Sequence, residues 1–128
     1  MVDGGRRDDV LTGHTGRDTL TGGAGANRFL FGTLDHSVPG PRRDVITDFK
    51  QGHDRIDLRR IDARKRQPGD QAFTFIGGRT FTGHDGELRS HPLGAETVVS
   101  ADVDGDKKPD FQVQLNGKFT LRGSDFQR

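Results

Sequence analysis

The sequence predicts an all-β protein that begins as a short solenoid of parallel strands and continues as antiparallel strands. From Gly4 the chain reads as three consecutive nine-residue units, GGRRDDVLT, GHTGRDTLT and GGAGANRFL, and a fixed short period is typical of stacked coils. The acidic residues are 17 Asp and only 2 Glu, a bias that favours turns over helices. Later segments such as Phe111–Leu115 alternate apolar and polar residues, as half-buried strands do.

Each nine-residue unit combines a turn with a very short strand. The first six residues are rich in Gly and Asp, which suits a tight turn with positive φ angles. The last three residues suit a strand with one side chain pointing inward. Turn carbonyls and one sixth-position side chain per unit offer the hard oxygen ligands that calcium prefers. The sixth positions hold Asp9, Asp18 and Asn27, and the eighth positions hold Leu11, Leu20 and Phe29.

These units resemble the RTX nonapeptide repeat, GGxGxDxUx, which forms a parallel β-roll with calcium between successive turns. In that family two repeats make one coil, so the ligands of one ion come from segments eighteen residues apart. The resemblance implies a first site from the carbonyls of Gly5 and Arg7 with Asp9, opposite the carbonyls of Gly22 and Ala24 with Asn27. It implies a second site from His14, Gly16 and Asp18, opposite the segment around His36.

Three positions depart from the repeat. Arg7 stands where the repeat has Gly, Asn27 replaces Asp, and His36 stands eighteen residues after Asp18. Each implied site therefore brings one negative charge where the family brings two, and calcium affinity depends on that charge. We expect weak calcium binding, and the alternative is a roll held together by packing alone.

The rest of the chain resembles the C-terminal domain of serralysin-type metalloproteases. The segment DVITDFKQGHDRIDLRRIDA, residues 44–63, and the segment GDQAFTFIG, residues 69–77, carry the likeness, which extends to about Phe126. It implies an RTX β-roll in residues 1–36 and an antiparallel β-sandwich-like cap with a secretion-signal region in residues 37–128, together forming one compact domain. Asp44 and Asp54 would complete the last calcium sites, or they would cap turns through hydrogen bonds to the backbone.

The cap contains a second acidic segment, DVDGDKKPD. Its carboxylates occupy positions 1, 3, 5 and 9 of an EF-hand-like numbering, at Asp102, Asp104, Asp106 and Asp110. The sixth position is Lys107, where an EF-hand has Gly, and no flanking helices are expected. The segment is therefore either a looser calcium loop or an acidic turn.

Several strands are predicted in the cap. Val45–Thr47, Arg55–Leu58 and Glu96–Ala101 are rich in β-branched and apolar residues. Asn116-Gly117 predicts a hairpin turn from Phe111–Leu115 to a return strand at Lys118–Leu121. The spacing of Phe73, Phe75 and Phe81 predicts that one face of a strand pair buries them in the core.

Composition limits the partners of the chain. The hydrophobic fraction is 29%, which makes disorder an alternative, although the regular repeat and the patterned Phe residues oppose it. The net charge is +1, and the densest basic run suggests a contact with an acidic polysaccharide or simply a solvated face. Its cations are Arg59, Arg60, Arg64, Lys65 and Arg66. There is no Cys, no apolar membrane span and no motif for specific nucleic-acid binding.

No catalytic motif accompanies the repeats. The five His residues form no His-Glu-x-x-His pair, and no Gly-x-Ser-x-Gly elbow or phosphate loop is present. The resemblance implies a non-catalytic calcium-binding domain that folds outside the cell after type I secretion and supports an upstream hydrolase or further repeats. The absence of an apolar N-terminal run fits export without a cleaved signal peptide. The alternatives are a glycan-binding module like the R-modules of mannuronan epimerases, or a fragment of an enzyme whose catalytic half lies upstream.

Overall fold

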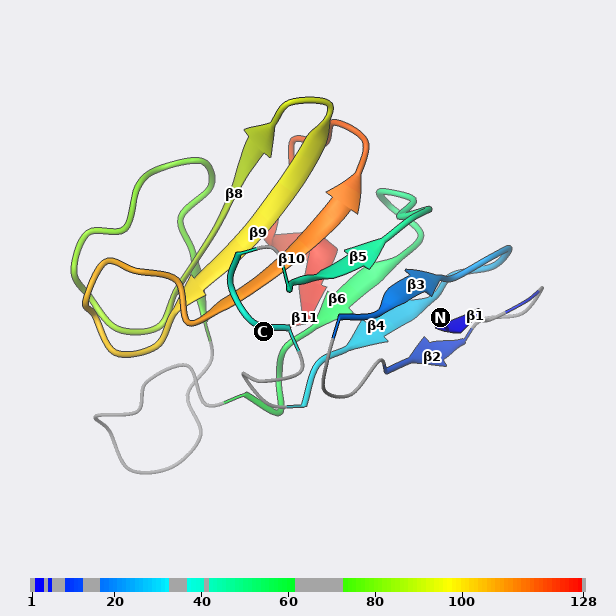
Figure 1. Ribbon diagram of the computed structural model, residues 1–128, viewed down its shortest axis with the longest axis horizontal. Helices are drawn as coiled ribbons and strands as arrows, with labels where there is room; N and C mark the ends of the chain where they lie inside the picture. Colours follow the sequence, from blue (N-terminus) through cyan, green and yellow to red (C-terminus); the bar gives the residue numbers. More distant parts are fainter. Residues whose placement is uncertain are drawn as a thin grey trace.

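The computed structural model describes residues 2–3, 5, 9–12, 17–32, 37–40, 42–61 and 73–127. This part of the chain is built from β-strands and a short 3-10 turn at Gly123–Asp125, which confirms the all-β prediction (Figure 1). Within it, no helix is long and apolar enough to cross a membrane. The strands are β1 (Val2–Asp3), β2 (Val10–Leu11), β3 (Thr19–Thr21), β4 (Arg28–Leu30), β5 (Asp44–Ile46), β6 (Arg55–Asp57), β7 (Thr74–Phe75), β8 (Glu87–Leu93), β9 (Glu96–Asp102), β10 (Phe111–Asn116) and β11 (Phe126–Gln127).

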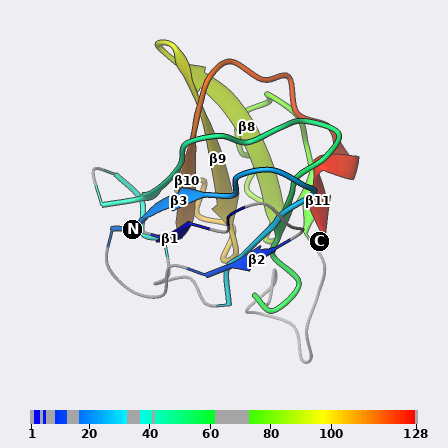
Figure 2. The same ribbon diagram turned by 90° about the vertical axis from the view of Figure 1, so that its right-hand side faces the viewer.

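The strands form two facing sheets. One has the order β1-β3-β5-β10-β9-β8-β7, and the other has the order β11-β6-β4-β2. From β1 to β6 the chain alternates between the sheets, and each strand pairs in parallel with the strand two places earlier. This winding is the predicted parallel β-roll, and Figure 2 faces the end of it where β1 and β2 lie.

The first coil has the register that two nonapeptides predict, but the next coil does not. Leu20 of β3 pairs with Val2 of β1, and Phe29 of β4 pairs with Leu11 of β2, so both intervals are eighteen residues. Leu20 then pairs with Ile46 of β5. The expected register is therefore wrong at this step, and Asp18 faces Asp44 instead of the segment around His36.

The cause of this shift is the segment that follows Phe31. It contains Pro39 and Pro41, which cannot donate ladder hydrogen bonds. The apolar pattern resumes only at Val45-Ile46, where Ile46 again points into the core and is fully buried. The chain thus leaves the roll after one regular coil and rejoins it at the first place where a core-facing strand is available.

The roll continues directly into the antiparallel part of the fold. The last β10 residues pair in parallel with β5 on one side and antiparallel with β9 on the other, so Val113 lies between Asp44 and Val99. On the other sheet β11 pairs in parallel with β6. Parallel pairing therefore extends well beyond residue 36, and the division of the chain at that residue stays a prediction.

The hairpin predicted at Asn116-Gly117 is wrong. Residues 118–121 form no strand, because both edges of β10 are already occupied by β5 and β9. The segment instead folds over the start of β9. There the Thr97 hydroxyl donates to the Gly117 carbonyl at 2.9 Å and accepts the Phe119 N–H at 3.0 Å.

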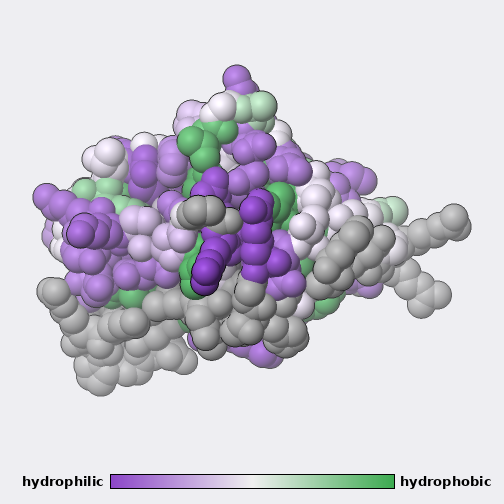
Figure 3. Space-filling model, in the orientation of Figure 1, coloured by the Kyte–Doolittle hydropathy of each residue, from purple (hydrophilic) through white to green (hydrophobic). Residues whose placement is uncertain are grey.

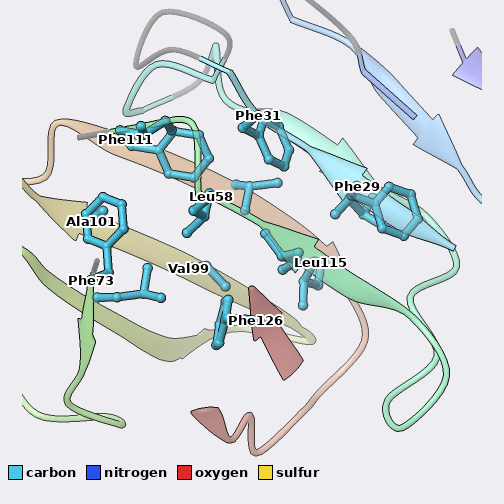
Figure 4. Packing of buried hydrophobic residues seen from close by; sticks show 14 of the residues in the cluster. Phe29, Phe31, Leu58, Phe73, Val99, Ala101, Phe111, Leu115 and Phe126 are labelled. Atoms are coloured by element: carbon cyan, nitrogen blue, oxygen red, sulfur yellow. The ribbon is translucent and has the colours of Figure 1, made fainter. Parts of the chain in front are cut away.

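The hydrophobic core lies between the two sheets (Figure 4). The eighth-position residues Leu11, Leu20 and Phe29 are all buried, as the repeat predicts. Phe31 and Phe111 meet edge-to-face with their ring centroids 5.0 Å apart, which joins the roll to the antiparallel strands. Phe73 is buried in this cluster, Phe75 is partly buried against it, and Phe81 is buried outside it. The predicted burial is therefore confirmed for Phe73 and Phe81, but the prediction that one shared face buries all three is wrong.

Candidate metal sites

The backbone N–H of each sixth-position residue is bound by a side chain of the next coil. The backbone N–H of Asp9 donates to Oδ1 of Asn27 at 2.9 Å, and the N–H of Asn27 donates to Oδ1 of Asp54 at 2.8 Å. On the opposite edge of the roll, the N–H of Asp18 donates to Oδ1 of Asp44 at 2.9 Å. In each of the accepting side chains, Asn27, Asp54 and Asp44, one oxygen is thus occupied by a backbone N–H of the preceding coil. The second polar atom decides whether the position can serve a metal.

At Asp18 and Asp44 the second oxygen is free in both residues. The Oδ2 atoms of both are buried without a hydrogen-bond partner in the described part of the chain, and Asp44 is fully buried. Burial raises the pKa of Asp44 to about 7; the Asp18 N–H opposes this rise and the Asp18 charge adds to it. Two adjacent carboxylates with unsatisfied oxygens fit a hard cation such as Ca²⁺. When both carboxylates are ionised this pair brings two negative charges, where the sequence predicted one for each site.

The position of Asp44 is fixed from its other side. Its N–H donates to the hydroxyl of Ser37 at 2.9 Å, and that hydroxyl donates to the carbonyl of Gln112 on β10. The Asp44 carboxylate therefore stands between the roll and the antiparallel strands. An ion bound here would stabilise the contact between both parts of the fold.

At Asn27 the second atom is an amide nitrogen, and it points at the turn carbonyls. Nδ2 lies 3.3 Å from the Gly23 oxygen, 3.5 Å from the Ala24 oxygen and 3.4 Å from the Gly25 oxygen. These acceptors face N–H groups, and a cation cannot share them with such donors. The Asn27 side chain therefore does not fit a calcium ligand in this orientation.

The other residues of this first implied site are partly engaged. The Gly5 carbonyl accepts the Ala24 N–H at 3.0 Å, and Oδ2 of Asp9 is buried with no hydrogen-bond partner among the residues that the structure describes. A Cβ on Gly22 would lie 2.6 Å from the Asn27 amide nitrogen, so Gly22 makes room for that amide. Arg7 lies outside the described residues, as do Gly16, His14 and His36 of the second implied site.

Asp54 and Asp48 serve as turn caps. Oδ1 of Asp54 accepts the Asn27 N–H, and Oδ2 accepts the Lys50 N–H at 3.0 Å, so both of its oxygens are satisfied. The two oxygens of Asp48 accept the N–H groups of Gly22 and Gly23, each at 2.8 Å. The sequence assigned no role to Asp48. A signal for this role exists in the sequence. The Gly22-Gly23 turn has backbone N–H groups that need acceptors, and Asp48 follows two strands later and can supply them.

The acidic segment after β9 forms a compact loop. The carboxylate oxygens of Asp102, Asp104, Asp106 and Asp110 lie within 4.8 Å of one another. Asp102, which is fully buried, accepts the Gly105 N–H at 2.9 Å and the Lys107 N–H at 3.0 Å. Burial and then the three neighbouring carboxylates raise the pKa of Asp110, although the Val103 N–H opposes this. The four residues that the sequence grouped lie together, and their hydrogen bonds to the backbone fit an acidic turn as well as a calcium loop.

Lys107 gives this loop the shape of an EF-hand-like turn. Its φ angle is +67°, and among the described residues it is the one non-glycine residue with positive φ. The sixth position of an EF-hand loop needs such a turn and uses Gly for it. The backbone has therefore adopted the required conformation in spite of the side chain.

The structure describes two cations of the basic run, Arg59 and Arg60. The Arg59 guanidinium binds both oxygens of Asp57, at 3.1 and 2.9 Å, and Arg28 approaches the same carboxylate at 3.5 Å. Burial acts to raise the pKa of Asp57, but the hydrogen bonds from Arg59 lower it overall. Arg60 is exposed, and Arg64, Lys65 and Arg66 lie outside the described residues.

A family model describes this combination of roll and cap. Residues 2–127 match the model for the serralysin C-terminal region of M10 peptidases. The chain belongs to the serralysin C-terminal family. That family is by its description the C-terminal part of a peptidase, which agrees with the resemblance seen in the repeats and in residues 44–77.

Solved structures share the fold of this serralysin C-terminal domain. The AlgE6R3 subunit of the Azotobacter vinelandii mannuronan C5-epimerase is 25% identical with a TM-score of 0.65; the alignment covers 98% of this chain and 65% of that one. The AlgE6R2 subunit of the same enzyme is 22% identical with a TM-score of 0.58, covering 98% and 90% respectively, and it supports the fold alone. A search of curated proteins found no match.

Proposed function

We propose that this serralysin C-terminal domain binds calcium between Asp18 and Asp44 and folds fully only when the ion is present. The observation that carries the proposal is the pair of buried Oδ2 atoms, for which the described parts of the chain supply no hydrogen-bond donor. In the unfolded chain both carboxylates are hydrated. Folding without a cation removes that water and brings the two charges together, which is unfavourable.

Bound calcium would make the burial of these two carboxylates favourable for folding. An ion that binds the folded state and not the unfolded state stabilises it by about 2.7 kcal/mol at a hundredfold excess over the dissociation constant. Asp18 and Asp44 would supply the charged ligands, and the turn carbonyls of the implied site, Gly16 among them, would supply neutral ones. The Asp102–Asp110 loop would hold a second ion, between β9 and β10.

This coupling suits a domain that leaves the cell before it folds. In calcium-poor cytoplasm the chain would stay unfolded and pass through a type I secretion apparatus. In millimolar extracellular calcium it would fold and so oppose return through the exporter. The family's position at the C-terminus of a peptidase supports an upstream hydrolase as its partner, to which this domain would contribute folding and no catalysis.

A calcium titration tests the proposal. Circular dichroism and calorimetry would follow the purified chain from chelator to millimolar calcium, with magnesium as the control ion. We expect the β signal and melting temperature to rise with calcium. In Asp18→Asn and Asp44→Asn the calcium response should shrink. Asp48→Asn is the matched control, because it weakens a turn cap outside the site and should keep the response. An equal response in all four proteins would refute the proposed site.

A second role is the binding of an acidic polysaccharide by the basic run. The structural likeness to a subunit of mannuronan C5-epimerase favours it. Arg59 already pairs with Asp57, so this role would depend on the other four cations, Arg60, Arg64, Lys65 and Arg66. Salt-sensitive glycan binding that disappears when Arg60, Arg64 and Arg66 are changed to Gln would support it, and binding that survives these changes would exclude it.

A further inference from the structure

The two sheets leave a cleft at the end of the sandwich where β8 turns into β9. Pro92 of β8 pairs with Thr97 of β9 there, and both belong to the rows of residues that face inward. The segment after β10 crosses this end without forming a strand, held by the hydrogen bonds of Thr97 to the backbone of Gly117 and Phe119. The cleft consists of two adjoining hollows of about 360 and 230 Å³, which share Pro92, Phe119 and Thr120.

Apolar surface lines much of this cleft. Phe119 and Pro92 contribute to the walls of both hollows, and Phe119 is only partly buried. Gly77 and Gly78 line the smaller hollow and carry no side chain that could fill it. At the rim, Leu93 is 47% exposed, and Figure 3 shows apolar surface at the top of the view, where the β8–β9 hairpin lies in Figure 1. This end of the core is therefore open to an apolar group from outside.

A cation stands beside the larger hollow. Lys118 lines this hollow, and its side chain is exposed. In the part of the chain that the structure describes, salt bridges are made by Arg28 and Arg59, and none involves Lys118. The ammonium group is therefore available to a ligand that carries a negative charge next to an apolar body.

The acidic residues nearest to this end of the sandwich face elsewhere. Glu96 precedes Thr97 on β9 and therefore projects from the opposite face of the strand. Asp125 is buried, and its Oδ2 accepts the Arg122 N–H at 2.7 Å. The Asp102–Asp110 loop begins at the other end of β9, about 20 Å away at roughly 3.3 Å per residue. A carboxylate at Lys118 would therefore meet no acidic side chain in the cleft.

We propose that this cleft binds a fatty acid of medium chain length. The alkyl chain would lie against Phe119 and Pro92 and enter the smaller hollow beside Gly78. The carboxylate would pair with Lys118 and accept a hydrogen bond from the hydroxyl of Thr120. An apolar space with one charged group at its edge is the usual form of a site for a small amphipathic ligand. None of the proposed calcium ligands lines the cleft, so this site is independent of the calcium proposal.

Calorimetric titrations with hexanoate, octanoate and octanol test the proposal. The full chain would be used under conditions in which circular dichroism shows it to be folded, with each probe kept below the concentration at which micelles or calcium salts form. We expect octanoate to bind about fifteenfold more tightly than hexanoate, because each buried CH₂ contributes about fourfold. Octanol should bind more weakly than octanoate, and only octanoate binding should weaken with added salt.

A substitution that fills the smaller hollow locates the alkyl chain. Gly78 has no positive φ, and a Cβ there would meet nothing closer than the Ser90 carbonyl oxygen at 3.6 Å. Gly78→Leu is therefore compatible with the backbone, and it should lower the association constant of octanoate at least tenfold by occupying the space. Thr74→Leu is the matched control, because Thr74 is exposed on β7 outside both hollows. It should leave the constant unchanged.

A second substitution locates the carboxylate. Lys118→Gln should lower the association constant of octanoate about threefold, since an exposed ion pair contributes little, and should leave that of octanol unchanged. Lys108→Gln removes an exposed lysine of the acidic loop, outside the cleft, and should change neither constant. Circular dichroism would confirm that every variant is folded.

Three results would overturn the proposal. The first is the absence of octanoate binding, and the second is equal binding of octanoate and octanol with no effect of salt. The third is octanoate binding that Gly78→Leu leaves intact, which would place the ligand elsewhere. A folded Asp44→Asn variant should bind octanoate like the unmodified chain. Failure of the calcium proposal therefore leaves this one standing.

Discussion

The N–H of Asp18 donates to Oδ1 of Asp44 at 2.9 Å, while the Oδ2 atoms of both residues are buried with no donor among the described residues. The hydrogen bond to Oδ1 stabilises the fold, because it joins two coils of the roll. The burial of the two Oδ2 atoms is unfavourable unless a proton or a cation is present. The same two side chains therefore provide both coil stacking and a requirement for an ion.

Replacing Asp44 with Asn should separate these two functions. Asp44→Asn keeps an oxygen for the Asp18 N–H and removes one buried charge. We expect a higher melting temperature than that of the unmodified chain in chelator, and a smaller rise when calcium is added. Differential scanning calorimetry with and without chelator measures both effects. A variant that loses stability in chelator and keeps the full calcium response would contradict the role of this carboxylate.

The stability of the calcium-free chain should fall as the pH rises. The pKa of Asp44 is raised to about 7 in the folded state, against an ordinary value of 3.8. The folded chain therefore holds this proton more tightly, and the stabilisation is complete below pH 3.8 and lost as pH rises through about 7. Melting temperatures in chelator from pH 4 to 8, taken as the difference from Asp44→Asn, measure this term. A difference that is constant with pH would argue against it.

Restoring the repeat at Asn27 should create a calcium site. In Asn27→Asp a carboxylate oxygen would face the carbonyls of Gly23, Ala24 and Gly25 in place of an N–H group. We expect a loss of about 1–3 kcal/mol of stability in chelator, as for other buried groups left unsatisfied. In calcium the loss should reverse, and isothermal titration should count one additional ion. Asn116→Asp, an exposed change of the same chemistry, is the control, and an unchanged ion count in Asn27→Asp would refute the assignment.

A glycine at position 107 should improve the acidic loop. Lys107 has a φ of +67°, which disfavours a side chain, so Lys107→Gly should stabilise the fold by about 0.5–1 kcal/mol. Calcium binding at Asp102–Asp110 should tighten because the turn is then unstrained. Lys108→Gly is the control and should destabilise the chain, since residue 108 has no positive φ. Urea denaturation of both variants checks this, and equal destabilisation would count against a strained loop.

The repeat made the core of the roll predictable. Leu11, Leu20 and Phe29 recur at one position of a nine-residue period, and a period of that kind leaves few ways to stack. The grouping of the four aspartates in the loop after β9 could be predicted equally well, because Asp102, Asp104 and Asp106 are two residues apart and Asp110 follows four residues later. In both cases the information is local in sequence.

The non-local features could not be predicted in this way. The partner of Asp18 depends on where the chain rejoins the roll after Phe31, and no period marks that place. The failed hairpin at Asn116-Gly117 has a similar cause, because the turn signal says nothing about whether β10 has a free edge. The orientation of the Asn27 amide follows from contacts with a neighbouring coil, so the sequence showed a weakened site but not the amide that fills it.

The most direct test is the anomalous diffraction of crystals grown in millimolar calcium. Our account predicts a calcium peak between Asp18 and Asp44, at about 2.3–2.6 Å from Oδ2 of each residue. No peak should lie beside the Asn27 amide. Calcium density confined to the Asp102–Asp110 loop, with Oδ2 of Asp18 and Asp44 bound only to water, would contradict the central claim.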